Sequence, residues 1–156
     1  MAWAQGDYEQ AGRRYEEVLA LNREMENKIT TAYALYGLGK VAQAKDDFAS
    51  ARSFHIKALT IRRGMGNRRA IAYSLNALAA LAATQQKAAW AVRLFGAAED
   101  LQKLIHFTIS PRERTEHDQA VATARAALGE EAFAAAWAEG KAMTLEQAIT
   151  YALEES

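Results

Sequence analysis

Residues 64–82 read GMGNRRAIAYSLNALAALA, and residues 24–42, forty positions earlier, read EMENKITTAYALYGLGKVA. The same offset of 40 residues aligns residues 6–21 with residues 46–61, and a weaker third copy begins at Gln86. A fixed period of this length is typical of proteins built from repeated pairs of secondary-structure elements. The positions that carry the alignment of the first two stretches are Met25 with Met65, Asn27 with Asn67, Tyr33 with Tyr73, Leu35 with Leu75 and Leu38 with Leu78.

Each repeat is predicted to be two helices, A and B, joined by a tight turn. Ala and Leu dominate the apolar residues and the chain has 1 Pro, a composition that favours helix. Small residues at Gly39 and Ala51 allow helices A and B of the second repeat to approach closely. A single pair cannot bury both faces, so we predict an all-α, right-handed solenoid of stacked antiparallel pairs. The apolar stripe of helix A in this repeat is formed by Ala32, Leu35, Leu38 and Ala42.

The first and third repeats depart from the pattern. In the 40-residue register Met1 aligns with Val41, so most of the first helix A is missing. We therefore expect the chain to be a piece of a longer protein, or to have an artificial start. We place the helical repeats at residues 1–103. The third repeat is degenerate at its turn glycine, its aromatic position and the glycine of the LG pair, which are Gln86, Ala88 and Ala79.

The period stops after Leu101, and residues 104–156 are predicted to form a helical cap. Ser110 and Pro111 begin a helix in this segment, and Gly129 ends it. A short helix follows as far as Gly140. A last helix starts with a capping box of Thr144 and Gln147. Such a cap seals the end of a solenoid, which otherwise exposes an apolar face.

The pair Leu38–Gly39, followed by an aromatic at Phe48 and by Ala51, resembles the tetratricopeptide repeat, as does GDYEQA at Gly6–Ala11. This resemblance implies that helices A line an inner groove that binds extended peptides or partner segments. The alternative is that Tyr33 and Tyr73 pack between repeats. Carried onto this sequence, the groove positions are Trp3, Tyr33, Tyr36, Lys40, Gln43, Tyr73 and Asn76.

RLFGAAEDLQ and, further on, LGEEAFAAAWAEGKAMTLEQAITYAL resemble the end of the helical-repeat region in MalT-like, LuxR-type bacterial regulatory ATPases. The resemblance implies a sensor or assembly module of a transcriptional or signal-transduction regulator. The ATPase and the DNA-binding or cyclase domain of such a regulator lie elsewhere. The chain has no GxxxxGK[ST] motif, so nucleotide or nucleic acid binding is expected only through domains absent from it.

The residues that could carry chemistry do not form a reactive set. The chain has no Cys, which excludes thiolate chemistry and Cys-ligated zinc. His55 aligns with Tyr15 and Phe95, which indicates a packing position. Glu113 and His117 are one helical turn apart and could supply two metal ligands, but a surface pair is the simpler interpretation because no third ligand accompanies them. We expect no catalysis, no cofactor and no metal.

Charge is balanced overall but uneven along the chain. Residues 1–104 have 15 Lys and Arg against 10 Asp and Glu, whereas residues 105–156 have 4 against 9. The cluster RRGMGNRR at residues 62–69 could meet nucleic acid phosphates, but Arg is also favoured where a helix ends, and no aromatic is interleaved for base stacking. An acidic protein partner or the acidic tail fits the cluster better. With neither a signal peptide nor a long apolar run, we expect a cytoplasmic protein without membrane contact.

Two functions remain open. The first is a binding module whose groove recognises a peptide, a protein or a small effector. The alternative is a structural module that self-associates to assemble its parent regulator. A groove ligand predicts that Tyr36→Ala or Lys40→Ala weakens binding while the fold survives. Self-association predicts instead that changes at residues 1–5 or in the tail alter the mass in solution.

Overall fold

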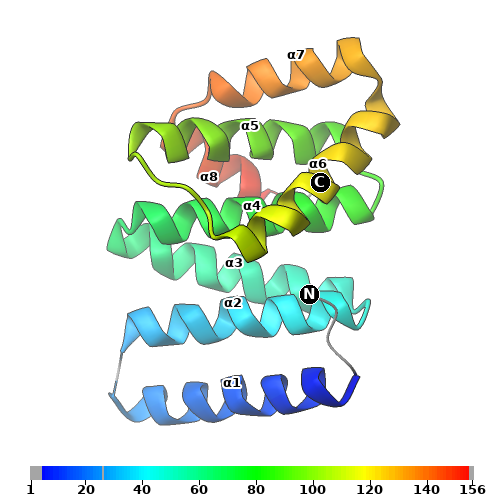
Figure 1. Ribbon diagram of the computed structural model, residues 1–156. Coiled ribbons are helices and arrows are strands. Elements are labelled where there is room, and N and C mark those ends of the chain that lie inside the picture. Colours follow the sequence, from blue (N-terminus) through cyan, green and yellow to red (C-terminus); the bar gives the residue numbers. More distant parts are fainter. Residues whose placement is uncertain (1–4, 26, 155–156) are drawn as a thin grey trace. The chain divides into compact units, whose positions relative to one another are not determined.

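The computed structural model describes residues 5–25 and 27–154, and the groove candidate Trp3 lies outside them. The described residues form eight α-helices and no strand (Figure 1). The predicted all-α class is therefore confirmed. The helices are α1 (Gln5–Met25), α2 (Lys28–Ala44), α3 (Phe48–Met65), α4 (Arg68–Thr84), α5 (Ala88–Leu104), α6 (Pro111–Leu128), α7 (Glu130–Lys141) and α8 (Leu145–Leu153).

The two helices A of the repeats, α2 and α4, begin with the same cap. Asn27 Oδ1 accepts a hydrogen bond from the Thr30 N–H at 3.2 Å, and Asn67 Oδ1 accepts one from the Ala70 N–H at 3.2 Å. Asp47 caps helix B of the second repeat, α3, in the same way. Each such cap contributes about 1 kcal/mol by satisfying an N–H that the helix leaves without a partner. The repeated Asn thus explains why both helices A start at equivalent positions.

The turns between helices A and B also repeat. Asp46 and Gln86, forty residues apart, have left-handed backbones with φ of 60° and 63°. The next N–H groups, of Asp47 and Lys87, donate to carbonyls five residues earlier at 2.9 and 3.0 Å. This bond closes the helix end and reverses the chain. Gln86, which marks the third repeat as degenerate in sequence, therefore keeps the turn geometry of the second repeat.

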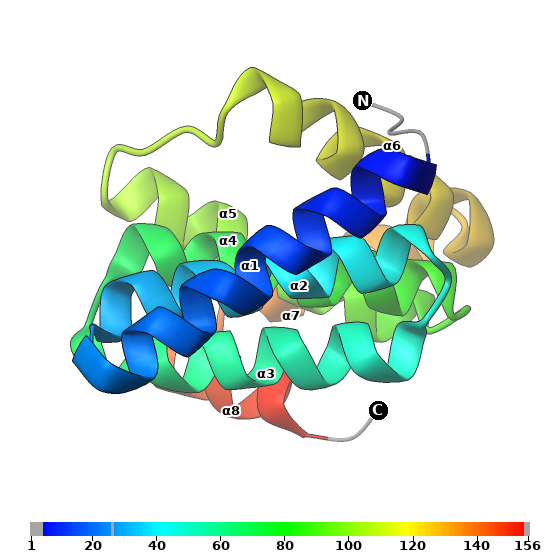
Figure 2. The same ribbon diagram turned by 90° about the horizontal axis from the view of Figure 1, so that it is seen from below.

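Contacts divide the chain into an N-terminal part, residues 1–66, and a C-terminal part, residues 67–156. In the N-terminal part, α2 packs against α1 and α3, and Figure 2 shows α1 crossing α2 obliquely. In the C-terminal part, α4 and α5 form the next pair, and α5 also contacts α6, α7 and α8. This packing as sequential pairs is consistent with a tetratricopeptide-like solenoid.

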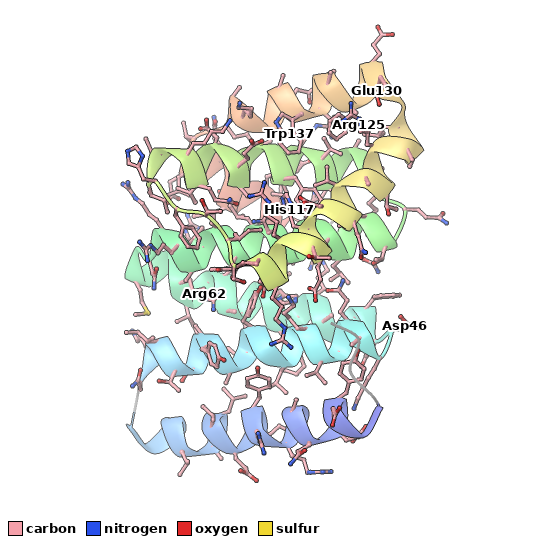
Figure 3. All side chains as sticks on the ribbon, viewed as in Figure 1. Asp46, Arg62, His117, Arg125, Glu130 and Trp137 are labelled. Atoms are coloured by element: carbon pink, nitrogen blue, oxygen red, sulfur yellow. The ribbon has the colours of Figure 1, made fainter. Side chains whose placement is uncertain are left out.

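The tail of the sequence forms helices α6, α7 and α8 within the C-terminal part. The Ser110 side chain accepts a hydrogen bond from the Glu113 N–H at 3.4 Å, and Thr144 and Gln147 form a full capping box. At the corner where α6 meets α7, the Arg125 guanidinium donates two hydrogen bonds to the Glu130 carboxylate (Figure 3). The predicted starts of α6 and α8 are confirmed. The predicted domain boundary after residue 103 lies one residue before the end of α5 at Leu104 and stays a prediction.

Glycines allow two close helix contacts. In the N-terminal part, a Cβ on Gly39 would lie 2.6 Å from the His55 ring, so the glycine makes room for that ring. In the C-terminal part, a Cβ on Gly96 would lie 2.5 Å from the Trp137 carbonyl oxygen, and a Cβ on Gly140 would overlap the Arg93 carbonyl. Helices α5 and α7 therefore touch backbone to backbone at two reciprocal glycines.

Candidate functional site

The predicted groove residues of the N-terminal part lie on one face of α2. Steps of four and three residues place Ile29, Tyr33, Tyr36, Lys40 and Gln43 in a single row, which we call the α2 face. Tyr33 is 57% exposed and Ile29 is 62% exposed, whereas Tyr36 is buried. Lys40 and Gln43 are half-buried. The row thus has an open apolar end and a polar end that is partly embedded.

Tyr36 is held by aromatic and cationic neighbours. Its ring meets the His55 ring edge-on, with centroids 5.4 Å apart and planes at 64°. The Arg62 guanidinium lies 4.7 Å from the Tyr36 centroid, and Lys40 Nζ lies 5.7 Å from it. Arg62, labelled in Figure 3, is 8% exposed. Each cation–π contact contributes about 0.5–2 kcal/mol, so the cluster fixes Tyr36 and places two positive charges beside it.

His55 is fully buried beneath this cluster. Neither ring nitrogen has a hydrogen-bond partner among the described residues. Burial is the main cause that lowers the pKa of His55 from 6.5 to about 3, and the charges of Lys40 and Arg62 lower it further. The imidazole is therefore neutral and acts as a flat packing group. The predicted packing position of His55 is confirmed.

The charge of the α2 face suits an anionic group. Residues 28–44 include two Lys and no Asp or Glu. The Lys40 ammonium and the Arg62 guanidinium both lie close to Tyr36, and burial of Arg62 reduces screening by water. A carboxylate that approached Lys40 would therefore be attracted, with Tyr33 beside it as an apolar surface.

In the C-terminal part, the equivalent face of α4 is covered by the chain's own linker to α6. Tyr73 Oη accepts a hydrogen bond from the Ser110 N–H at 3.2 Å. The Phe107 ring meets the Tyr73 ring edge-on at 5.5 Å, and the Arg69 guanidinium lies 5.1 Å from the Phe107 centroid. Asn76 Nδ2 donates to Gln102 Oε1 at 3.0 Å. The predicted groove residues Tyr73 and Asn76 thus hold segments of their own chain.

The contacts of Phe107 and Ser110 with Tyr73 were not predicted from the sequence. The segment IHFTIS lies after the last repeat, where the 40-residue register gives no partner. Tyr33, by contrast, meets Tyr15 of α1 edge-on, with centroids 6.0 Å apart, and stays mostly exposed. Tyr33 therefore touches a neighbouring repeat and still offers an exposed surface, and its place in a binding groove stays a prediction.

The residues considered for metal binding do not converge. His117 Nδ1 lies 3.2 Å from Asp118 Oδ1, and its ring packs edge-on against Phe95 at 5.0 Å. Within residues 5–25 and 27–154, no group of three or more His, Asp or Glu side chains could hold a metal ion. An open cleft of about 620 Å³ between α7 and α8 is lined by Glu139, Glu146 and Glu154, but Glu139 is already paired with Arg93 at 2.7 Å. The α2 face is thus the better candidate site.

A known protein family matches the N-terminal part of the chain. Residues 1–64 match the family model of the tetratricopeptide repeat, a range that includes α1, α2 and nearly all of α3. The search of curated proteins and the search of solved structures gave no match. The chain therefore contains an all-helical tetratricopeptide repeat region, and the α2 face lies inside it. None of the described helices is long and apolar enough to cross a membrane.

Proposed function

We propose that this chain is a non-catalytic protein-interaction module that binds a partner segment along the α2 face. Tetratricopeptide repeats are in general protein-interaction modules and typically non-catalytic, and residues 1–64 match that family. The observation that carries the proposal is the contrast within one row of side chains. Tyr33 is 57% exposed, while the next groove residue, Tyr36, is buried under its contacts with Arg62 and His55.

This arrangement supports binding because part of the surface is already ordered. Tyr36 and Lys40 are positioned by the cluster around His55, so a ligand loses less free energy in fixing them. Tyr33 supplies apolar area and a hydroxyl group. The Gln43 amide offers donors and an acceptor to a peptide backbone, and Lys40 offers a positive charge to a carboxylate.

The sequence resemblance of residues 93–102 and 128–153 supports a place for this module in a bacterial transcriptional or signal-transduction regulator of the MalT-like, LuxR-type class. In that setting the α2 face senses a partner or effector, and the ATPase and output domains lie in other parts of the protein. Nucleic acid is then contacted only by those other domains. The setting is cytoplasmic.

Self-association is the second candidate function, and exposed apolar residues of the N-terminal part favour it. Leu21 on α1 is 64% exposed and Ile29 on α2 is 62% exposed. A second copy that covered them would gain about 25 cal/mol per Å² of apolar area. Light scattering over a wide concentration range separates the two functions, because a mass that stays dimeric on dilution favours assembly and a monomer favours partner binding.

The binding function is tested with linear 12-residue peptides selected from a random display library on the immobilised chain. Lys40→Ala is expected to weaken binding of the selected peptides about fivefold, which corresponds to about 1 kcal/mol for the loss of one partly exposed ion pair. Lys57→Ala is the matched control, since Lys57 is exposed on the other helix, α3. Equal effects of the two substitutions would show that the α2 face is not the binding surface.

A further inference from the structure

The 40-residue repeat supplies a direct comparison for the exposed end of the α2 face. Ile29 and Arg69 occupy the same position in their helices A, as do Tyr33 and Tyr73. Both helices start from equivalent Asn caps, so residues 40 positions apart in the sequence also occupy equivalent positions in the two helices. What covers Tyr73 in the C-terminal part therefore indicates what fits against Tyr33 in the N-terminal part.

The occupant of the α4 face is a short non-helical segment. Residues 107–110 follow the left-handed residue His106 and precede α6. The Phe107 ring is held between the Tyr73 ring, at 5.5 Å, and the Arg69 guanidinium, at 5.1 Å. Three residues later, the Ser110 N–H donates to Tyr73 Oη at 3.2 Å. One aromatic side chain and one backbone donor thus define this interaction.

The α2 face offers the equivalent ring and hydroxyl group, those of Tyr33, and within residues 5–25 and 27–154 no segment like residues 107–110 is bonded to them. Tyr33 is 57% exposed, and no hydrogen bond joins its hydroxyl to another described residue. Ile29, in the place of Arg69, is 62% exposed and presents an apolar surface where α4 presents a cation. An aromatic ring laid over Ile29 would bury apolar area. An edge-on contact of that ring with Tyr33 would add the favourable interaction energy of an aromatic pair.

Resting on the proposed function, we propose that the α2 face binds an extended partner segment with an aromatic anchor. The aromatic side chain lies over Ile29 and against Tyr33, as Phe107 lies against Arg69 and Tyr73. A backbone N–H three residues further along the partner donates to Tyr33 Oη. The chain's own residues 107–110 are the template for this ligand.

The first test uses a fluorescent, acetylated and amidated peptide of residues 104–112, LIHFTISPR, titrated into the full chain by anisotropy. The peptide with Ala in place of the Phe is expected to bind about tenfold more weakly, because the aromatic anchor is lost. Ile29→Ala and Tyr33→Ala in the protein are expected to weaken the original peptide about fivefold. Tyr33→Phe is expected to cost about threefold, because only the hydroxyl acceptor is removed.

Controls separate this site from other surfaces. Leu21→Ala removes an equally exposed apolar side chain from α1 and is expected to leave binding unchanged. Melting curves by circular dichroism check that Ile29→Ala and Tyr33→Ala fold. The proposal is overturned if the peptide does not bind, if the Phe-to-Ala peptide binds equally well, or if Tyr73→Ala weakens binding and Tyr33→Ala does not.

The selected library peptides distinguish failure of this proposal from failure of the proposed function. Selected peptides that are enriched in aromatic residues, and whose binding is weakened by Ile29→Ala and Tyr33→Ala, support both the aromatic anchor and the proposed binding function. Peptides that depend on Lys40 but neither contain an aromatic nor respond to Ile29→Ala overturn the aromatic anchor and leave the binding function standing. Peptides indifferent to every substitution on the α2 face overturn both. A dimer that dissociates in both Tyr33→Ala and Phe107→Ala variants identifies a second copy as the occupant and overturns the partner proposal.

Discussion

His55 occupies an aromatic position of the repeat with a side chain that brings two polar atoms into the core. Tyr15 and Phe95 stand at the equivalent positions, so the alignment was enough to predict packing for this residue. The alignment did not show that both ring nitrogens lack partners among the described residues, because that depends on what Gly39 and Tyr36 leave around the ring. A buried polar group without a partner costs about 1–3 kcal/mol.

His55→Phe is therefore expected to raise the free energy of unfolding by about 1 kcal/mol at pH 7, because it keeps an aromatic ring in the core and removes the two nitrogens that lack hydrogen-bond partners among the described residues. His55→Ala is the contrasting variant and is expected to lower it by about 3 kcal/mol through the cavity it leaves. Urea unfolding followed by circular dichroism measures both changes. A His55→Phe variant less stable than the original would show that the nitrogens are satisfied in solution.

The same residue predicts how stability depends on pH. The folded pKa of His55, about 3, lies below the value of about 6.5 expected for the unfolded chain, so acid protonates the unfolded state first. The contribution of His55 is complete above pH 6.5 and is lost as the pH falls from 6.5 toward 3. The expected slope is about 1.4 kcal/mol per pH unit in that window. The groups that face the imidazole are Tyr36 and Lys40 of α2 and Arg62 of α3.

Urea titrations at pH 7, 6, 5 and 4 test this dependence, with His55→Phe as the matched control. The difference in unfolding free energy between the two proteins is expected to grow steadily as the pH falls. Other groups that titrate in this range, such as Glu9 whose pKa is lowered by Lys45, are common to both proteins and cancel. Parallel curves for the two proteins would contradict the assignment.

At the scale of elements, the contact between α5 and α7 depends on two glycines that the sequence did not single out for packing. Gly140 was predicted to end a helix, but α7 extends to Lys141 and the glycine faces the Arg93 carbonyl instead. The helices themselves and their caps could be predicted, because apolar spacing and capping residues are local signals. The pairing of α5 with α7 could not, since two single glycines far apart in sequence carry no periodic signal.

Gly140→Ala is expected to destabilise the C-terminal part by about 2–3 kcal/mol, because its Cβ would overlap the Arg93 carbonyl and force the helices apart. Gly64→Ala is the matched control, because nothing lies within 4 Å of the added Cβ in α3. That substitution is expected to stabilise the helix by about 0.5–1 kcal/mol through helix propensity alone. Thermal unfolding of both variants measures the contrast, and a neutral Gly140→Ala would mean that α7 does not pack as closely as described.

For the molecule as a whole, the sequence predicts the number and order of the helical pairs but not the coverage of the α4 face. The number and order of the pairs can be predicted because the sequence pattern of a helical pair recurs 40 residues later. The segment around Phe107 has no copy, so its contact with Tyr73 had no signal in the sequence. Of the candidate groove, the row on α2 could be predicted, whereas the difference between an open Tyr33 and a covered Tyr73 needed the fold.

The uneven charge of the whole chain predicts how salt affects binding. Residues 48–66, which belong to the same part of the chain as the α2 face, have four basic residues and no acidic one, so they contribute a positive field. Selected peptides with a carboxylate are expected to bind several-fold more weakly as the NaCl concentration rises from about 50 to 300 mM. Over this range the Debye length, the distance over which exposed charges interact, falls to several ångströms. Lys40→Ala is expected to reduce this salt dependence, which anisotropy titrations measure. An unchanged dependence would place the carboxylate elsewhere on the chain.

The glycine contact between α5 and α7 also has a consequence for the order in which the protein is made. The contacts of α2 are with α1 and α3, which are synthesised directly before and after it. Helix α5 ends at Leu104, whereas its partner α7 is complete only at Lys141. At translation rates of about 5–20 residues per second, the side of α5 that packs against α7 remains exposed for roughly two to seven seconds before α7 is complete. During synthesis, that side of α5 therefore stays exposed to solvent and to chaperones until α7 has formed.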